Sequence, residues 1–278
     1  MLHDISSQRL NYEGSQIELI KSLPFFKMVS NHEDTLQYCR SMTHRRQKRI
    51  PWSLSHRSMN TLRTWFESKD CSILIGESHG VKTSSRDFAV NLLDLVLQRS
   101  FPVIWALPIS ISEDDIPDIE GVLASLVIQA MELNPSVLSM GANPISTRHF
   151  KSTLSVEQWF QLLQKSIQGM NSLLIILDFT MLQASLKKSN SLTPEEFLEA
   201  LLNMKGRHGP TLKIVALTWK LEPVIANRSE DSLATQFIAT DPGPSKVRLM
   251  RNPRYRAAFS ARRQKLAVAL REATVTVD

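Results

Sequence analysis

The stretch "SILIGESHGVKTSS", Ser72–Ser85, decides how the rest of the sequence is interpreted. It contains a short apolar run, then a glycine loop, then Lys-Thr at the start of a helical pattern. This layout is typical of a phosphate-binding loop, in which backbone N–H groups and a helix N-terminus hold the anion. In the pattern G-x-x-x-x-G-K-[ST], Gly76 is the first glycine. Lys82 would reach the terminal phosphates, and the Thr83 hydroxyl would hold magnesium.

The last glycine of that pattern is missing. Val81 stands in its place, and Gly80 lies one residue too early. A β-branched residue forced to a positive φ costs on the order of 1–3 kcal/mol. The loop is therefore either rearranged around Gly80 or a poor nucleotide binder. A tight strand-to-helix turn with a surface lysine is the competing interpretation.

Bulk composition indicates an ordinary globular protein. Of the 278 residues, 42% are hydrophobic and 22% charged, and no apolar run reaches the roughly 18 residues of a membrane span. The start lacks the apolar core of a secretory signal. Two cysteines, Cys39 and Cys71, are too few for a disulfide framework or a thiolate zinc site. We expect a cytoplasmic location, with a nuclear one also compatible.

Basic residues gather in two segments of the chain, which has a net charge of +6. One covers residues 44–57, and the other covers residues 246–271 and contains no acid. Such segments can meet nucleic-acid backbones or anionic lipid. A solvated helix face or tail is the favoured interpretation of both segments.

Hydrophobic periodicity predicts short helices over residues 1–60, followed by alternating strands and helices. Strands are expected at 71–75, 101–107, 172–177 and 212–217, and helices at 84–100, 119–135, 155–170 and 193–206. Two helices open with capping boxes, Ser155 with Gln158 and Thr193 with Glu196. Strands that alternate with helices predict a three-layer α/β core with a mostly parallel sheet.

An acidic residue ends the most apolar of these strands. Asp178 follows "SLLIIL", at the position where nucleotide hydrolases carry a magnesium-coordinating carboxylate. A cap or turn residue after a strand is the alternative. Together with the loop at Gly76, Asp178 favours the nucleotide-binding interpretation.

The order of segments resembles the NACHT-type module of the STAND class of P-loop NTPases, in its fungal branch. The matching segments are "TLRTWFESKDCSILIGESHG", "VLASLVIQAMELNPSVL", "SVEQWFQLLQKSIQGMNSLLIILD" and "TLKIVALTWKLEP". The resemblance covers roughly residues 61–224. It implies a P-loop NTPase-like core at 61–225, between a helical segment at 1–60 and a basic, partly helical tail at 226–278.

This sequence differs from that family at the positions of its catalytic residues. The second Asp and the following Glu that position water in the family fall on Met181 and Leu182. The Ser/Thr-Arg sensor becomes Thr218-Trp219-Lys220, with Lys220 one place beyond the expected arginine. Neither Met nor Leu can act as a base. The phosphate loop, the acids after Asp178 and the sensor are all altered, which favours loss of nucleotide hydrolysis.

The sequence thus predicts a degenerate NACHT/STAND-like protein that is non-catalytic or binds nucleotide weakly. Its role would be regulatory or scaffolding, through contacts with other proteins. ATP or GTP would contact the loop, and Thr83 and Asp178 would hold magnesium if nucleotide binds. One alternative is an active nucleoside-triphosphatase with a variant loop. Another is a basic nucleic-acid-associated adaptor that uses residues 44–57 and 246–271.

Overall fold

The computed structural model describes most of the chain up to the end of the fourth strand, and one further strand. The described residues are 2–29, 31–47, 56–78, 82–108, 116–139, 144–150, 154–189, 192–204, 209–218 and 235–240.

Helices and strands alternate from residue 72 onward, as the sequence predicts. The helices are α1 (Leu2–Lys21), α2 (Pro24–Met28), α3 (His32–Gln47), α4 (His56–Glu67), α5 (Lys82–Gln98), α6 (Ile119–Leu133), α7 (Val156–Ser166), α8 (Phe179–Ser189) and α9 (Pro194–Asn203). Two short 3₁₀ helices are η2 (Pro135–Leu138) and η3 (Thr147–Phe150). The strands are β1 (Ser72–Glu77), β2 (Val103–Ala106), β3 (Ser172–Asp178), β4 (Thr211–Thr218) and β5 (Thr235–Ala239).

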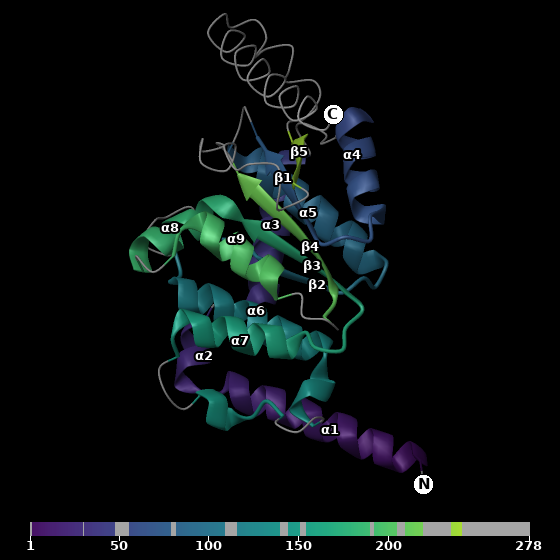
Figure 1. Cartoon of the computed structure of the whole chain (residues 1–278), viewed down its shortest axis with the longest axis vertical. Helices are drawn as coiled ribbons and strands as arrows, with labels where there is room; N and C mark the ends of the chain where they lie inside the picture. The colour runs from purple at the N-terminus through teal and green to yellow at the C-terminus, as the bar shows by residue number, and fades with distance from the viewer. Residues whose placement is uncertain are drawn as a thin grey trace, which may run out of the picture.

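The strands form one sheet in the order β2-β3-β4-β1-β5. All its pairings are parallel, so every strand has its carboxyl end at the same edge. β4 lies between β1 and β3, although it follows both in sequence (Figure 1). Parallel strands need crossover connections, and helices supply those that the structure describes, between β1 and β4 in the sequence.

Alternate residues of each strand face opposite sides of the sheet. In β3, Leu173, Ile175 and Leu177 join a core with α6, α7, α8 and α9. Leu174 and Ile176 join a second core with α3, α4 and α5. Because both faces are covered, the strands are mostly apolar on both sides, which is typical of a parallel sheet. The architecture is the predicted three-layer α/β sandwich.

The N-terminal helices pack onto both cores. Ile17 and Ile20 of α1 and Phe26 of α2 belong to the core around α6, and α1 lies at the N-terminal end of the molecule in Figure 1. Leu36 of α3 and Trp65 of α4 belong to the opposite core. The part of residues 1–60 that the structure describes is mostly helical and contributes to both cores of the α/β unit.

Both predicted capping boxes are confirmed. The Ser155 and Gln158 pair opens α7, and the Thr193 and Glu196 pair opens α9. Each satisfies two backbone donors that a helix start leaves unpaired.

Two elements were not predicted. α8 begins directly after Asp178. β5 lies within residues 226–278, where a tail was expected, and pairs with β1 from Ile73 to Glu77. A strand that completes a sheet through long-range pairing leaves little local signal in five residues. Among the described residues, no helix is long and apolar enough to cross a membrane.

Candidate functional site

The predicted site residues of β1 and β3 lie in one row across the sheet. Gly76 is in register with Leu217 of β4, and Leu217 is in register with Asp178. Two strand spacings, about 10 Å, therefore separate Gly76 from Asp178 at the carboxyl edge. α5 follows β1 on one face and α8 follows β3 on the other. In open α/β sheets, ligands bind outside the carboxyl ends where the connections diverge in this way.

Gly76 is required by packing, independently of any ligand. A Cβ built on it would lie 2.7 Å from Cδ2 of Leu217 and 3.1 Å from Cγ2 of Thr240. The Phe88 side chain follows at 3.8 Å. The first glycine of the loop pattern therefore lets β4, β5 and α5 approach β1 closely.

The loop itself is only partly described. Gly80 and Val81 lie outside the described residues. Lys82 is the first residue of α5, but its side chain is also outside them. Thr83 is half-buried in the first turn of that helix. α5 thus starts where a phosphate-binding helix would start, after a strand of suitable direction.

Asp178 is the last residue of β3, and its side chain is 8% exposed. Its Oδ1 atom accepts a hydrogen bond of 3.0 Å from the backbone N–H of Met181. The carboxylate therefore caps α8. Burial raises the pKa of Asp178, while the Met181 N–H and the Arg86 charge act in the opposite direction. The net direction disfavours the charged form that a cation would need.

The residues that follow Asp178 turn into the core. Met181 is 6% exposed and Leu182 is 1% exposed, and both pack in the core around α6. The resemblance to the NACHT-type family implies acids that position water at these two positions. The chain enters α8 directly at Phe179, and both side chains are buried among apolar neighbours.

Residues at the ends of β4 and β5 form hydrogen bonds with the end of β1. Thr218 is buried, and its carbonyl accepts a 3.0 Å hydrogen bond from the N–H of Ser78. Thr240 donates its N–H to the Glu77 carbonyl at 2.9 Å. The sensor-like Thr218 therefore lies next to Ser78, where the loop after β1 begins. Lys220 lies outside the described residues.

Arg86 is a residue that the sequence analysis missed. Its Nε is buried and has no hydrogen-bond partner among the described residues. Burial raises the pKa of both Asp178 and Cys39, and the Arg86 charge opposes that rise in each case. The signal in the sequence is its position, because Arg86 heads a helical face continued by the buried Val90 and Leu93.

The side chains at this edge do not fit the magnesium ion that the fold class implies. One oxygen of Asp178 is occupied by the α8 backbone, and the Arg86 cation acts on the same carboxylate. Among the described residues, no group of three or more His, Cys, Asp or Glu side chains could hold a metal. Magnesium prefers several oxygen ligands in octahedral geometry, and a nearby cation opposes it.

Part of the first basic segment is used inside the protein. Arg46 pairs with Asp87 of α5, whose Oδ1 also accepts a 2.8 Å hydrogen bond from the Thr43 hydroxyl. Arg40, just before the segment, pairs with Asp94 at 2.6 Å. These pairs hold α3 against α5. Residues 48–55 and 246–271 lie outside the described residues.

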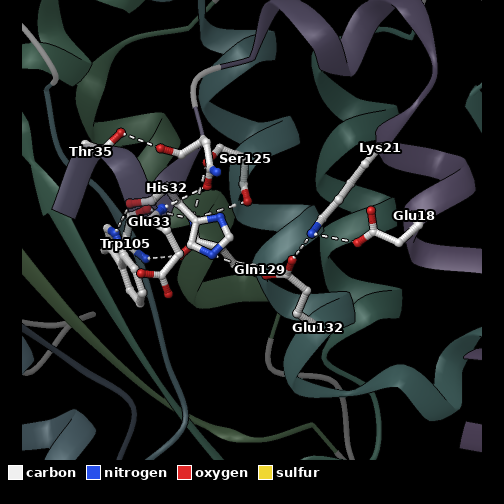
Figure 2. A network of polar contacts seen from close by, with 10 residues as sticks. Glu18, Lys21, His32, Glu33, Thr35, Trp105, Ser125, Gln129 and Glu132 are labelled. Carbon is white, nitrogen blue, oxygen red and sulfur yellow. Dashed lines mark hydrogen bonds and ion pairs between the residues drawn. The ribbon is translucent and has the colours of Figure 1, made fainter. Parts of the chain in front are cut away.

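A separate polar network joins α1, α3 and α6 (Figure 2). The Nε2 atom of His32 lies 3.2 Å from Glu132, and the Lys21 ammonium lies 2.5 Å from the same carboxylate. Trp105 Nε1 donates to the His32 carbonyl at 3.3 Å. A cavity of about 210 Å³ adjoins this network at the carboxyl end of β2, and Asp118 and His32 are among its lining residues.

No family model and no curated protein matches the sequence. Solved structures of Drosophila ORC are similar to it. The one bound to DNA shows 13% identity and a TM-score of 0.37, over 81% of this chain and 35% of the ORC chain. The one bound to GC-rich DNA and Cdc6 shows 14% identity and a TM-score of 0.35, over 82% and 34%. The chain spans about a third of these ORC chains. A similarity of this size says nothing about the activity of this protein.

Proposed function

We propose that this protein is a degenerate P-loop NTPase-like core that binds nucleotide weakly or not at all and does not hydrolyse it. One observation carries the proposal. The strand-end carboxylate of Asp178 caps α8, and the two following positions that would carry catalytic acids are buried apolar side chains. A water-activating acid therefore has no place at the carboxyl edge after β3.

We further propose that the ancestry of this core is of the NACHT type in the STAND class. The support is physical contact between segments that carry the resemblance. Lys213, in the "LKIVAL" strand, donates to the Trp65 carbonyl at 2.9 Å and lies 5.4 Å from the centre of the Trp65 ring. Its ammonium also donates to the Ser72 hydroxyl at 3.1 Å. The tryptophan helix, the first strand and the fourth strand are thus tied together at the amino edge of the sheet.

A core of this kind acts as a scaffold or regulator, through contacts with other proteins. The sheet presents helices on both of its faces without any need for nucleotide hydrolysis. If ATP or GTP binds, Lys82 and Thr83 at the start of α5 are the residues that contact phosphate, because a helix N-terminus favours an anion.

A nucleotide titration, followed by thermal unfolding with and without magnesium, tests this function. A ligand at one hundred times its dissociation constant stabilises a protein by about 2.7 kcal/mol. We expect no such stabilisation at concentrations that saturate a working NTPase. The loop variant Val81→Gly, which restores the glycine, is expected to bind more tightly than wild type. Strong magnesium-dependent stabilisation of wild type, lost in Lys82→Ala, would overturn the proposal.

A further inference from the structure

The cavity at the carboxyl end of β2 has mainly apolar and aromatic walls and a volume of about 210 Å³. Its aromatic walls are Trp105 and Phe25, and its aliphatic walls include Leu107, Val122 and Met181. A dry cavity of about 150 Å³ accommodates benzene. This one therefore has room for an aromatic ring with a short side chain. β2 lies three strand spacings, roughly 14 Å, from β1, so the cavity is separate from the glycine loop.

The polar side chains that line the cavity are neutral or negative. No lysine or arginine is among the described residues that line it. Burial lowers the pKa of His32, so its ring is neutral at physiological pH. The Nε2 atom of His32 lies 3.2 Å from Glu132, and the ring lies between Trp105 and Glu132 in Figure 2. Because Nε2 then carries the ring proton, Nδ1 is left as a hydrogen-bond acceptor.

Asp118 supplies the negative charge at the exposed side of the cavity. Its Oδ1 atom accepts the Gly121 N–H at 2.7 Å and so caps α6. The second carboxylate oxygen makes no hydrogen bond to the residues that the structure describes. The N-terminus of α6 carries about half a positive charge, which the full charge of Asp118 exceeds. A carboxylate and the faces of aromatic rings both attract a cation, so this cavity favours a positively charged ligand.

We propose that the cavity at the end of β2 binds a small organic cation of the arylalkylamine class. Its aromatic ring packs against Trp105 and Phe25, and its ammonium group pairs with Asp118. Such binding goes beyond the proposed function and needs no nucleotide. A nucleotide does not suit this cavity, because its phosphates would meet the Asp118 carboxylate without a lysine or arginine among the described lining residues.

Saturation-transfer NMR of the full chain tests the proposal with 2-phenylethylamine, which is a cation at neutral pH. The matched neutral probe is 2-phenylethanol, and the matched anion is phenylacetate. We expect 2-phenylethylamine to bind saturably with a Kd of about 1 mM, as suits a ligand of this size. Because an exposed ion pair contributes modestly, 2-phenylethanol should bind roughly 2–5 times more weakly. Phenylacetate should bind more weakly than both.

Asp118→Asn removes the charge and keeps an oxygen that can cap α6. It is expected to erase the preference for 2-phenylethylamine over 2-phenylethanol. Glu120→Gln is the matched control, because it removes a charge from the same helical turn at a residue that does not line the cavity. This control should keep the preference. Ser125→Leu enlarges a side chain in the cavity wall and should weaken both probes by more than about tenfold, since filled space excludes a ring.

The proposal is overturned if 2-phenylethylamine does not bind wild type saturably, or if the three probes bind equally well. It is also overturned if Asp118→Asn and Glu120→Gln change the preference to the same extent. Binding retained by a Ser125→Leu variant with a cooperative thermal transition would contradict it too, because the ligand would then lie elsewhere. If Ser125→Leu does not fold, the two charge variants decide. ATP and GTP are absent throughout, so failure here leaves the proposed function untouched.

Discussion

The backbone N–H of Met181 donates a 3.0 Å hydrogen bond to Oδ1 of Asp178. This contact assigns the strand-end carboxylate to the helix that follows it. In a working nucleotide hydrolase the corresponding carboxylate serves a metal ion. Here the chain enters α8 without a loop, and Met181 and Leu182 belong to the core.

An acid restored after Asp178 is expected to unfold the protein rather than to restore hydrolysis. Leu182 is 1% exposed among apolar side chains, so Leu182→Glu buries an unpaired carboxyl group. The free energy of unfolding should fall by more than about 4 kcal/mol. Gln183→Glu, on the same helix at a half-buried position, is the control and should cost far less. Denaturant titration measures both. A stable Leu182→Glu variant would contradict this packing.

Gly76→Ala is expected to destabilise the protein by about 1–3 kcal/mol, because the added methyl group overpacks a close contact. Its Cβ would lie 2.7 Å from the Leu217 side chain. Gly14→Ala is the control, since nothing lies within 4 Å of a Cβ at Gly14 in α1, and alanine suits a helix. Chemical denaturation compares the two. Equal effects would show that the glycine at 76 is not needed for packing.

Gln129 of α6 bonds to the backbone of β2, which is an outer strand of the sheet that the structure describes. Its side chain accepts from the Trp105 N–H and donates to the Trp105 carbonyl, both at 2.9 Å. Gln129→Leu leaves two buried backbone groups unpaired and should cost roughly 2–5 kcal/mol. Gln164→Leu removes only a long hydrogen bond of 3.4 Å to Met204 and should cost about 1 kcal/mol or less. If the two losses in denaturant midpoint are equal, the pairing at Trp105 contributes little.

His32 makes the stability depend on pH. Burial lowers its pKa below the ordinary 6.5, although Glu132 and Glu33 act in the opposite direction and Lys21 reinforces the decrease. The folded state then binds fewer protons than the unfolded state below pH 6.5, so the free energy of unfolding falls as the pH drops. In His32→Gln that slope should become shallower. Unfolding titrations across this range test it, and parallel profiles for the two proteins would contradict it.

The local patterns of the sequence predicted the layers of the fold well. The capping boxes at Ser155 and Thr193 and the apolar run before Asp178 each depend on a few neighbouring residues, so they could be recognised without the structure. The parallel direction of the sheet followed from the alternation of strands and helices, whereas the order of its strands was not predicted.

Features that depend on distant contacts could not be predicted in the same way. The bonds between Gln129 and Trp105 span 24 residues, and the bond between Thr43 and Asp87 spans 44. β5 pairs with a strand more than 150 residues earlier, and the five-residue strand carries no strong period.

Release of inorganic phosphate tests the central claim most directly. Wild type and Lys82→Ala are incubated in parallel with ATP and with GTP in the presence of magnesium. Phosphate release by the two proteins is expected to be indistinguishable, because no acid after β3 can position water. Magnesium-dependent turnover by wild type that disappears in Lys82→Ala would contradict it.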